Sequence, residues 1–249
     1  MGWRRSLPWP LGPVAHRGLH DAARGVIENT ASAFEAAIAA GYAIETDIQA
    51  AEGGEPVVFH DDTLERLTLG AGPIAAQKPA ALKAIAFRET ADRILTLAEF
   101  LDLVGGRVPV FMEIKSHGHR QNRDLERRIG ARLAAYRGPL AVMSFDPGSV
   151  RAMRSFAPDR PRGIVSMRYT KEEWPDLSPL ARFRLTHLLD FPATRPDFLA
   201  YHIDDLPRPQ IAALRRLGFP VLVWTVRTQE QRRRAAIYAD AIIFEGMRP

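Results

Sequence analysis

Four short clusters of polar residues in the first quarter of the chain hold side chains that bind metals, anions and protons. They are His16-Arg17-Gly18, Glu28-Asn29-Thr30, Glu45-Thr46-Asp47 and His60-Asp61. Most of them directly follow a short apolar run. Polar side chains at the downstream ends of buried strands lie where parallel α/β folds bind ligands. Two histidines, an arginine and a carboxylate pair in such positions indicate a metal-assisted site for an anionic substrate.

The elements that must position these clusters alternate between strand-like and helical patterns. Eight strands are expected to begin near residues 14, 43, 109, 140, 162, 198, 220 and 241. Strands alternating with helices in a chain of 249 residues predict an α/β fold, a single TIM (β/α)8 barrel spanning residues 1–249. A hairpin-like piece and an irregular stretch predict a small inserted segment after the second strand, at about residues 53–92. A doubly wound open sheet is the alternative, but its glycine-rich phosphate turn is missing.

Carboxylates at the strand ends favour a metal site. Glu45 and Asp47 stand at positions i and i+2 of one strand, so their side chains face the same way. Glu113 ends a later strand and adds a third carboxylate. Converging carboxylates repel one another unless a cation lies between them, and hard oxygen ligands suit Mg²⁺ or Ca²⁺. The alternative is that these acids form salt bridges with arginines of the barrel.

Histidines and basic residues supply the other expected functions. His16 and His60 each end an apolar run, and an imidazole donates or accepts a proton near neutral pH. Arg17 and Lys115 carry charges suited to phosphate oxygens, or alternatively neutralise the carboxylates beside them. Four other histidines are interpreted as ordinary hydrogen-bonded residues: His20, His117, His119 and His187.

Three further residues are expected to support the site. Glu28 is expected to support the site indirectly, by holding Arg17 or a histidine in position. Asn29 shares this supporting role, although Asn29 or Thr30 also fits the N-cap of the helix that follows. Trp224 is interpreted as an apolar wall of the pocket, with a core position as the alternative.

Composition narrows the classes of function. The formal charge is +5 and the isoelectric point about 9.9, but the basic residues are scattered. The densest run, Arg232-Arg233-Arg234, reads as a solvated helix face, so no nucleic-acid partner is expected. The chain has no cysteine, which excludes disulfides and thiolate metal sites. Without a signal-peptide pattern or an apolar membrane-spanning stretch, we expect a cytoplasmic protein with no stable membrane insertion. The oligomeric state is not indicated.

The order and spacing of these motifs resemble those of the glycerophosphodiester phosphodiesterases, a family of phospholipase C-like TIM barrels. The likeness begins with the four clusters, including Val57-Val58-Phe59 before His60, and continues through later strand ends. These are Glu113-Ile114-Lys115, Ser144-Phe145-Asp146 and Trp224-Thr225-Val226. The resemblance therefore covers nearly the whole chain.

The resemblance implies a TIM barrel with a small insertion that hydrolyses glycerophosphodiesters to glycerol 3-phosphate and an alcohol. It implies one divalent metal ion, Mg²⁺ or Ca²⁺, and a small-molecule glycerophosphodiester as the substrate. Carried over by position, the metal ligands would be Glu45, Asp47 and Glu113, the acid–base pair His16 and His60, and the phosphate contacts Arg17 and Lys115.

Three departures from the family pattern stand out. Ile27 replaces a proline before Glu-Asn-Thr, and Gly53-Gly54 replaces Asp-Gly in a turn. The last strand ends in Phe244-Glu245 instead of Thr-Asp, which we expect to affect the choice of alcohol. A lysophospholipase D-like enzyme is the nearest alternative, with an acyl groove formed by residues 62–92 and 168–197. A binding protein that keeps the barrel but has no catalytic activity is a more distant alternative.

Overall fold

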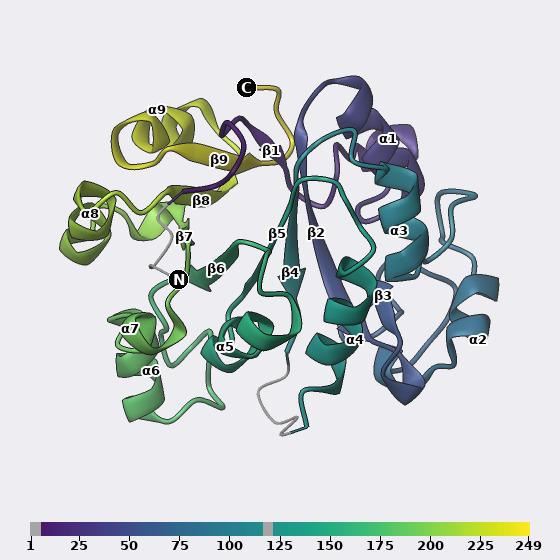
Figure 1. The fold of residues 1–249 in the computed structure, drawn as a ribbon. Helices are drawn as coiled ribbons and strands as arrows, with labels where there is room; N and C mark the ends of the chain where they lie inside the picture. Colours follow the sequence, from purple (N-terminus) through teal and green to yellow (C-terminus); the bar gives the residue numbers. More distant parts are fainter. Residues whose placement is uncertain (1–5, 117–121) are drawn as a thin grey trace.

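Eight parallel strands close on themselves, with helices packed around the outside (Figure 1). The computed structural model describes residues 6–116 and 122–249, so the expectations for His117 and His119 fall outside the described residues. The two-residue strand β1 (Val14–Ala15) closes the barrel, because it pairs with both β2 (Ala43–Ala50) and β9 (Ala241–Phe244). Between them run β4 (Val110–Ile114), β5 (Leu140–Ser144), β6 (Arg162–Ser166), β7 (Phe198–His202) and β8 (Val221–Val226). The predicted TIM barrel is confirmed.

The helices follow the strands around the barrel. They are α1 (Ala31–Ala39), α2 (Pro79–Ala84), α3 (Leu97–Val104), α4 (Asp124–Leu133), α5 (Pro147–Phe156), α6 (Pro179–Thr186), α7 (Phe191–Thr194), α8 (Pro209–Arg216) and α9 (Gln229–Tyr238). Thr96 and Glu99 form a capping box at the start of α3, and Thr228 and Gln231 form another at α9. No helix in the described ranges is long and apolar enough to cross a membrane.

The start of α1 differs from the expected cap. Thr30 occupies the N-cap position, but its side chain accepts no hydrogen bond from the helix. Its hydroxyl instead donates to the carbonyl oxygen of Ile27, at 2.7 Å. The helix is held from its other side, where Ala33, Phe34 and Ala37 are buried. The start of α1 is therefore held by this packing and by the hydrogen bond between Thr30 and Ile27, and not by a capping side chain.

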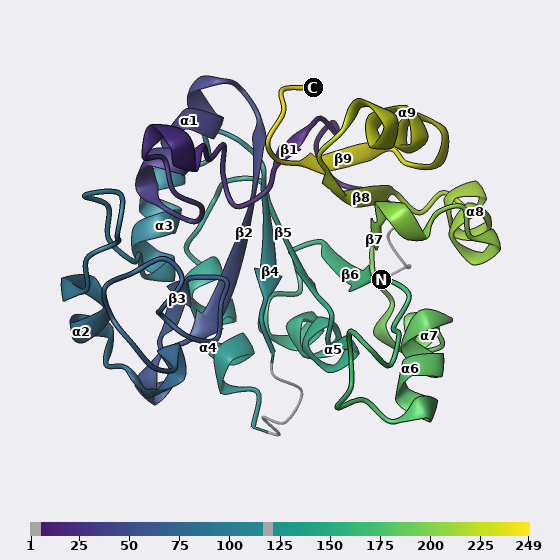
Figure 2. The same cartoon turned by 180° about the vertical axis from the view of Figure 1, so that it is seen from behind.

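Between β2 and α3 the chain leaves the barrel in an irregular excursion. Its strand β3 (Pro56–Val58) runs antiparallel to the end of β2, and Figure 2 shows β3 and α2 together on that side of the barrel. The excursion has an apolar cluster of its own, which includes Phe59, Leu64 and Phe87. This packing fixes the loop that carries His60, because that residue directly follows β3 and Phe59.

The inside of the barrel changes from apolar to charged along its axis. Trp9 packs edge-on against Phe111, with ring centroids 6.2 Å apart, near the amino ends of the strands. Side chains two residues apart share one face of a strand, so Glu113 continues the inward face of Phe111. In the same way Glu45 and Asp47 continue the face of Ala43, which belongs to the apolar cluster inside the barrel. The charged groups are thus gathered at the carboxyl ends of the strands.

Gly130 is expected to be essential for the close contact between α4 and α5. A methyl group at this position would lie 2.4 Å from the backbone oxygen of Phe156. Glycine to alanine normally stabilises a helix by about 1 kcal/mol, but such an overlap costs about 1–3 kcal/mol or more. We expect Gly130→Ala to lower the free energy of unfolding in a urea titration. The matched control is Gly12→Ala, since nothing lies within 4 Å of a methyl group there. Unchanged stability of Gly130→Ala would show that the two helices adjust freely.

Candidate active site

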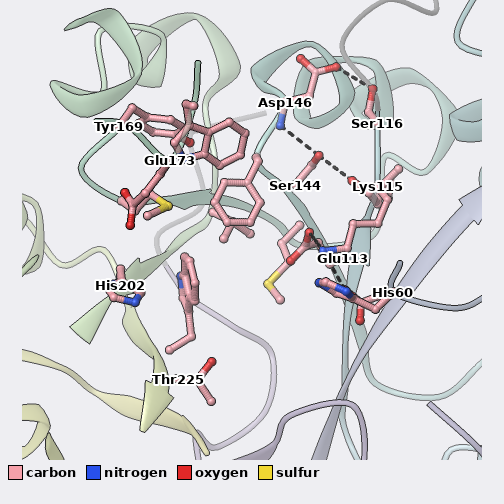
Figure 3. Close-up of a pocket in the computed structure, with 18 of the residues that line it drawn as sticks. His60, Glu113, Lys115, Ser116, Ser144, Asp146, Tyr169, Glu173, His202 and Thr225 are labelled. Atoms are coloured by element: carbon pink, nitrogen blue, oxygen red, sulfur yellow. Dashed lines mark hydrogen bonds and ion pairs between the residues drawn. The ribbon is translucent and has the colours of Figure 1, made fainter. Parts of the chain in front are cut away.

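A cavity of about 1040 Å³ opens at the carboxyl ends of the barrel strands. Figure 3 shows part of its lining, with His60, Glu113 and Lys115 on one side and Tyr169, Glu173 and His202 on the other. Nearly all the residues singled out from the sequence line this cavity: His16, Arg17, Glu45, Asp47, His60, Glu113, Lys115 and Trp224. Glu28 and Asn29 lie behind them and contact Arg17 and Asp47. The sequence therefore predicted residues that the fold brings together.

Three buried carboxylates form the centre of the site. Asp47 of β2 pairs in register with Glu113 of β4, and Glu45 lies two residues before Asp47 on the same face. One oxygen of each carboxylate lies within 4.8 Å of the others. Burial, together with the charges of Asp47 and Glu113, raises the pKa of Glu45, and burial raises the pKa of Glu113. A hard divalent cation fits this oxygen set, because it would offset the desolvation and mutual repulsion of these acids.

Two basic side chains contact these acids. Lys115 Nζ lies 2.7 Å from Glu113 Oε1 and 3.1 Å from Asp47 Oδ1, while Arg17 Nε lies 3.3 Å from Asp47 Oδ2. Burial opposes the ionisation of Asp47, but Lys115 and Arg17 hold its pKa well below the ordinary value. The basic residues thus do neutralise carboxylates, which was the alternative to a phosphate contact. Both also line the cavity, so their charges border the space that a substrate would enter.

The turn after β1 has a constrained backbone. Arg17 has a φ of 53°, in the left-handed region that side chains larger than glycine rarely adopt. In this conformation its backbone N–H donates to Glu45 Oε2 at 3.0 Å. Gly18 follows with a φ of 81°, and a methyl group there would lie 2.8 Å from the backbone of Ala33. Glycine is therefore required at position 18 for this turn to fit against α1.

Each candidate acid–base histidine is held by a carboxylate through its Nδ1 atom. His16 Nδ1 lies 2.5 Å from Glu245 Oε2, and His60 Nδ1 lies 2.8 Å from Asp61 Oδ1. Burial lowers the pKa of His16, and the hydrogen bond with Glu245 opposes this shift. A proton held on Nδ1 leaves the Nε2 lone pair of a neutral imidazole available as a base. His16 Nε2 lies 3.9 Å from Glu45 Oε2, on the side of the acids.

Glu245 acts on His16 in a way that the sequence reasoning missed. Closure of the barrel pairs β1 with β9, and the backbone N–H of His16 donates to the Phe244 oxygen at 2.9 Å. Glu245 therefore stands next to His16 despite a separation of 229 residues. Arg227 Nε holds its other oxygen at 2.7 Å. The effect of this strand end on the choice of alcohol stays a prediction, and the Glu245 carboxylate in addition contacts a candidate base. The pairing of first and last strands in a closed barrel is the signal that could have revealed this contact.

A chain of ion pairs runs behind the cavity from Arg17 to His60. Arg17 Nη1 and Arg66 Nη2 each lie 2.7 Å from Glu28 Oε1, and Arg66 Nε lies 2.5 Å from Asp61 Oδ2. Because Asp61 also holds His60, the excursion that carries Arg66 is tied to both parts of the site.

Asn29 contacts the acids more directly than Glu28 does. Its Nδ2 donates to Asp47 Oδ2 at 2.9 Å, and its Oδ1 accepts from the Thr46 hydroxyl at 2.8 Å. Asn29 is buried and has a φ of 57°, which asparagine tolerates better than most residues. These contacts fix the side chain of Asp47 among the three acids.

Comparison with known proteins places this geometry in a family. A model of the glycerophosphoryl diester phosphodiesterase family matches residues 16–247. The chain belongs to this family.

Relatives of this family extend the likeness. A glycerophosphodiester phosphodiesterase of Caldanaerobacter subterraneus is 32% identical over 171 residues, which cover 65% of this chain and 69% of that protein. Human glycerophosphodiester phosphodiesterase 1 is 30% identical over 155 residues, 58% of this chain and 45% of the human one. In fold, the chain is similar to an Oleispira antarctica phosphodiesterase solved with the product sn-glycerol-3-phosphate. The TM-score is 0.77 at 22% identity, over 94% of this chain and 92% of the other.

Proposed function

We propose that this protein hydrolyses glycerophosphodiesters to glycerol 3-phosphate and an alcohol, with residues 1–249 as one catalytic unit that carries an insertion at about 53–92. The observation that carries the proposal is the arrangement at the barrel mouth. Two histidines, each held through Nδ1 by a carboxylate, border a cavity that contains three buried acids. Membership of the phosphodiesterase family and the likeness to a protein solved with glycerol 3-phosphate support it.

Glu45, Asp47 and Glu113 would hold one divalent ion, Mg²⁺ or Ca²⁺. Such an ion, when bound, supplies stabilisation of developing negative charge and lowers the pKa of a nearby hydroxyl. Arg17 and Lys115 border the same acids and would orient the phosphate of the substrate. Trp224 would form the wall against which the rest of the substrate packs.

Proton transfer is assigned to the two histidines. His16 Nε2 would accept the proton of the attacking hydroxyl as its oxygen bonds to phosphorus. His60 Nε2 would donate a proton to the alcohol oxygen as its bond to phosphorus breaks. His16 suits the role of base because it is buried, with its pKa lowered by burial. His60 suits the role of acid because its side chain is more exposed, at 32% against 12% for His16. The attacking hydroxyl is water or a neighbouring hydroxyl of the glycerol.

The test is release of glycerol 3-phosphate from purified protein given a panel of glycerophosphodiesters. We expect release from these diesters, and little hydrolysis of a diester without a glycerol group, which is followed by release of its alcohol. Hydrolysis only of the latter would contradict the proposal. Adding an acylated analogue of glycerophosphocholine tests the lysophospholipase D-like alternative. This alternative takes its acyl groove from residues 62–92 and 168–197. Of the first segment only Asp62 lines the described cavity, whereas the second contributes side chains that include Tyr169, Trp174 and Leu177.

Replacing Glu245 tests the assignment of His16. Glu245→Gln keeps an oxygen that accepts from His16 Nδ1 but removes the charge that stabilises a protonated imidazole. We expect kcat to fall about 10- to 100-fold with little change in KM, as for other residues that orient catalytic groups. Glu245→Asp keeps the charge and should retain more activity than the glutamine variant. The control is Glu230→Gln, since Glu230 is exposed on α9. An unchanged kcat in Glu245→Gln would remove this carboxylate from the account.

A further inference from the structure

The cavity has two unlike halves. The charged half contains the acids, basic residues and histidines described above. The other half is lined by aromatic rings from four successive strand ends: Phe145, Tyr169, Trp174, His202 and Trp224. Figure 3 shows Tyr169, Glu173 and His202 facing the charged half across the cavity. If the phosphate of a diester lies at the charged half, one of its two ester groups would reach the aromatic rings.

These rings form one continuous cluster. Phe145 lies at its centre, with ring centroids 5.8 Å from Trp174 and 5.4 Å from Trp224. Tyr169 packs on Trp174 at 5.0 Å, and His202 packs on Trp224 at 4.8 Å. Phe145, Trp174 and Trp224 are only partly buried, so each leaves part of its ring open to the cavity. The faces of such rings are electron-rich and attract cations.

The formal charges of this half are predominantly negative. Glu173 and Asp176 line it from the segment after β6. Glu173 accepts a hydrogen bond from the Thr170 hydroxyl at 3.2 Å, and among the described residues no lysine or arginine forms an ion pair with it. Arg227 also lines the cavity, but its guanidinium is bound to Glu245. The aromatic half thus offers ring faces and carboxylates, a combination that suits a cation with apolar substituents.

We infer that the aromatic half binds the leaving alcohol and selects a quaternary ammonium head group, as in a choline ester. This inference rests on the proposed function, because it assumes that the phosphate lies at the charged half. A quaternary ammonium has no N–H donors to satisfy, and its methyl groups contact ring faces while its charge is attracted to them. An anionic head group would instead meet Glu173 and Asp176. The rings of Trp174 and Trp224 act as specificity residues here and take no part in proton transfer.

The test compares glycerophosphocholine with its carbon isostere, in which a tert-butyl group replaces the trimethylammonium group. The two differ in charge and hardly in shape. We expect kcat/KM of the wild-type protein to be about tenfold higher for the choline ester. Glycerophosphoglycerol is the third substrate, because its head group has neither charge nor methyl groups. Equal kcat/KM for the choline ester and the isostere would overturn the inference.

Variants assign the preference to particular side chains. Trp174→Leu should lower kcat/KM about tenfold for the choline ester, through KM, and leave glycerophosphoglycerol nearly unchanged. Glu173→Gln should lower kcat/KM about two- to fivefold for the choline ester alone. Because Glu173 is exposed, this change tests the charge without disturbing folding, and Glu172→Gln is the matched control outside the cavity. An equal loss on all three substrates would show a merely structural role and contradict the inference.

The same assay separates the two proposals. Release of glycerol 3-phosphate from all three substrates without a choline preference would refute the head-group site and leave the proposed function standing. Absence of release from every substrate would refute both.

Discussion

His16→Ala and His60→Ala are each expected to lower kcat by about 10²- to 10⁴-fold, the usual contribution of a general acid or base. Both variants should still fold. Arg227 still holds Glu245 when His16 is removed, and Arg66 still holds Asp61 when His60 is removed. The measurement is glycerol 3-phosphate release at saturating substrate, with circular dichroism to confirm folding. His187→Ala is the control, since His187 packs on Phe183 with ring centroids 4.4 Å apart and does not line the cavity. Near-normal turnover in either variant would remove that histidine from the mechanism.

The choice of leaving group then separates the two roles. A nitrophenol leaves without needing a proton, because its conjugate base is stable. On the glycerophosphodiester of nitrophenol, His60→Ala should therefore recover much of its activity, whereas His16→Ala should not. Recovery of His16→Ala instead would reverse the assignment of acid and base. Recovery of neither would mean that His60 does not protonate the leaving alcohol.

Glu45→Gln is expected to abolish metal binding. Without metal, the variant should be at least as stable as the wild-type protein. The carboxylate of Glu45 is buried beside Asp47 and Glu113, whose charges oppose its own. A neutral amide of the same shape removes this repulsion but also removes a charged ligand. We expect kcat to fall at least about 100-fold at a metal concentration that saturates the wild-type protein, the upper range seen when groups supporting a metal are removed.

Thermal unfolding gives a readout of the same variant that does not depend on activity. A metal present at about 100 times its Kd should stabilise the wild-type protein by about 2.7 kcal/mol. Glu45→Gln should lose most of this gain, and Glu35→Gln should keep it, since Glu35 lies in an exposed ion pair with Arg107. An equal metal-dependent rise in Tm in both variants would exclude Glu45 as a ligand.

Local signals account for the elements that the sequence predicts well. Helices α3 and α9 begin at capping boxes, and the spacing of Thr96 from Glu99 and of Thr228 from Gln231 can be read directly from the sequence. Strand β2 extends three residues past Asp47, to Ala50. The cause is non-local: Gln49 and Ala50 pair with Val57 and Pro56 of the antiparallel β3, which prolongs the ladder. A strand's end depends on its partners as well as on its own residues.

The site likewise combines contacts that follow from local sequence with contacts between distant parts of the chain. Glu45 and Asp47 could be placed on one face from their spacing alone, and Glu113 joined them because neighbouring parallel strands share an edge. The contact of Glu245 with His16 depends on closure of the barrel across almost the whole chain. The aromatic half depends in part on the segment after β6, whose Tyr169 and Trp174 line the cavity. Contacts between side chains of distant loops leave no periodic pattern in the sequence.

Metal dependence of glycerol 3-phosphate release is the most direct test of the account. Purified protein is assayed on one glycerophosphodiester as prepared, after treatment with a chelator, and after addition of Mg²⁺ or Ca²⁺ in excess of the chelator. We predict that release stops on chelation and returns with one of the two ions. Release that continues unchanged in the chelator would contradict the assignment of Glu45, Asp47 and Glu113 as a metal site.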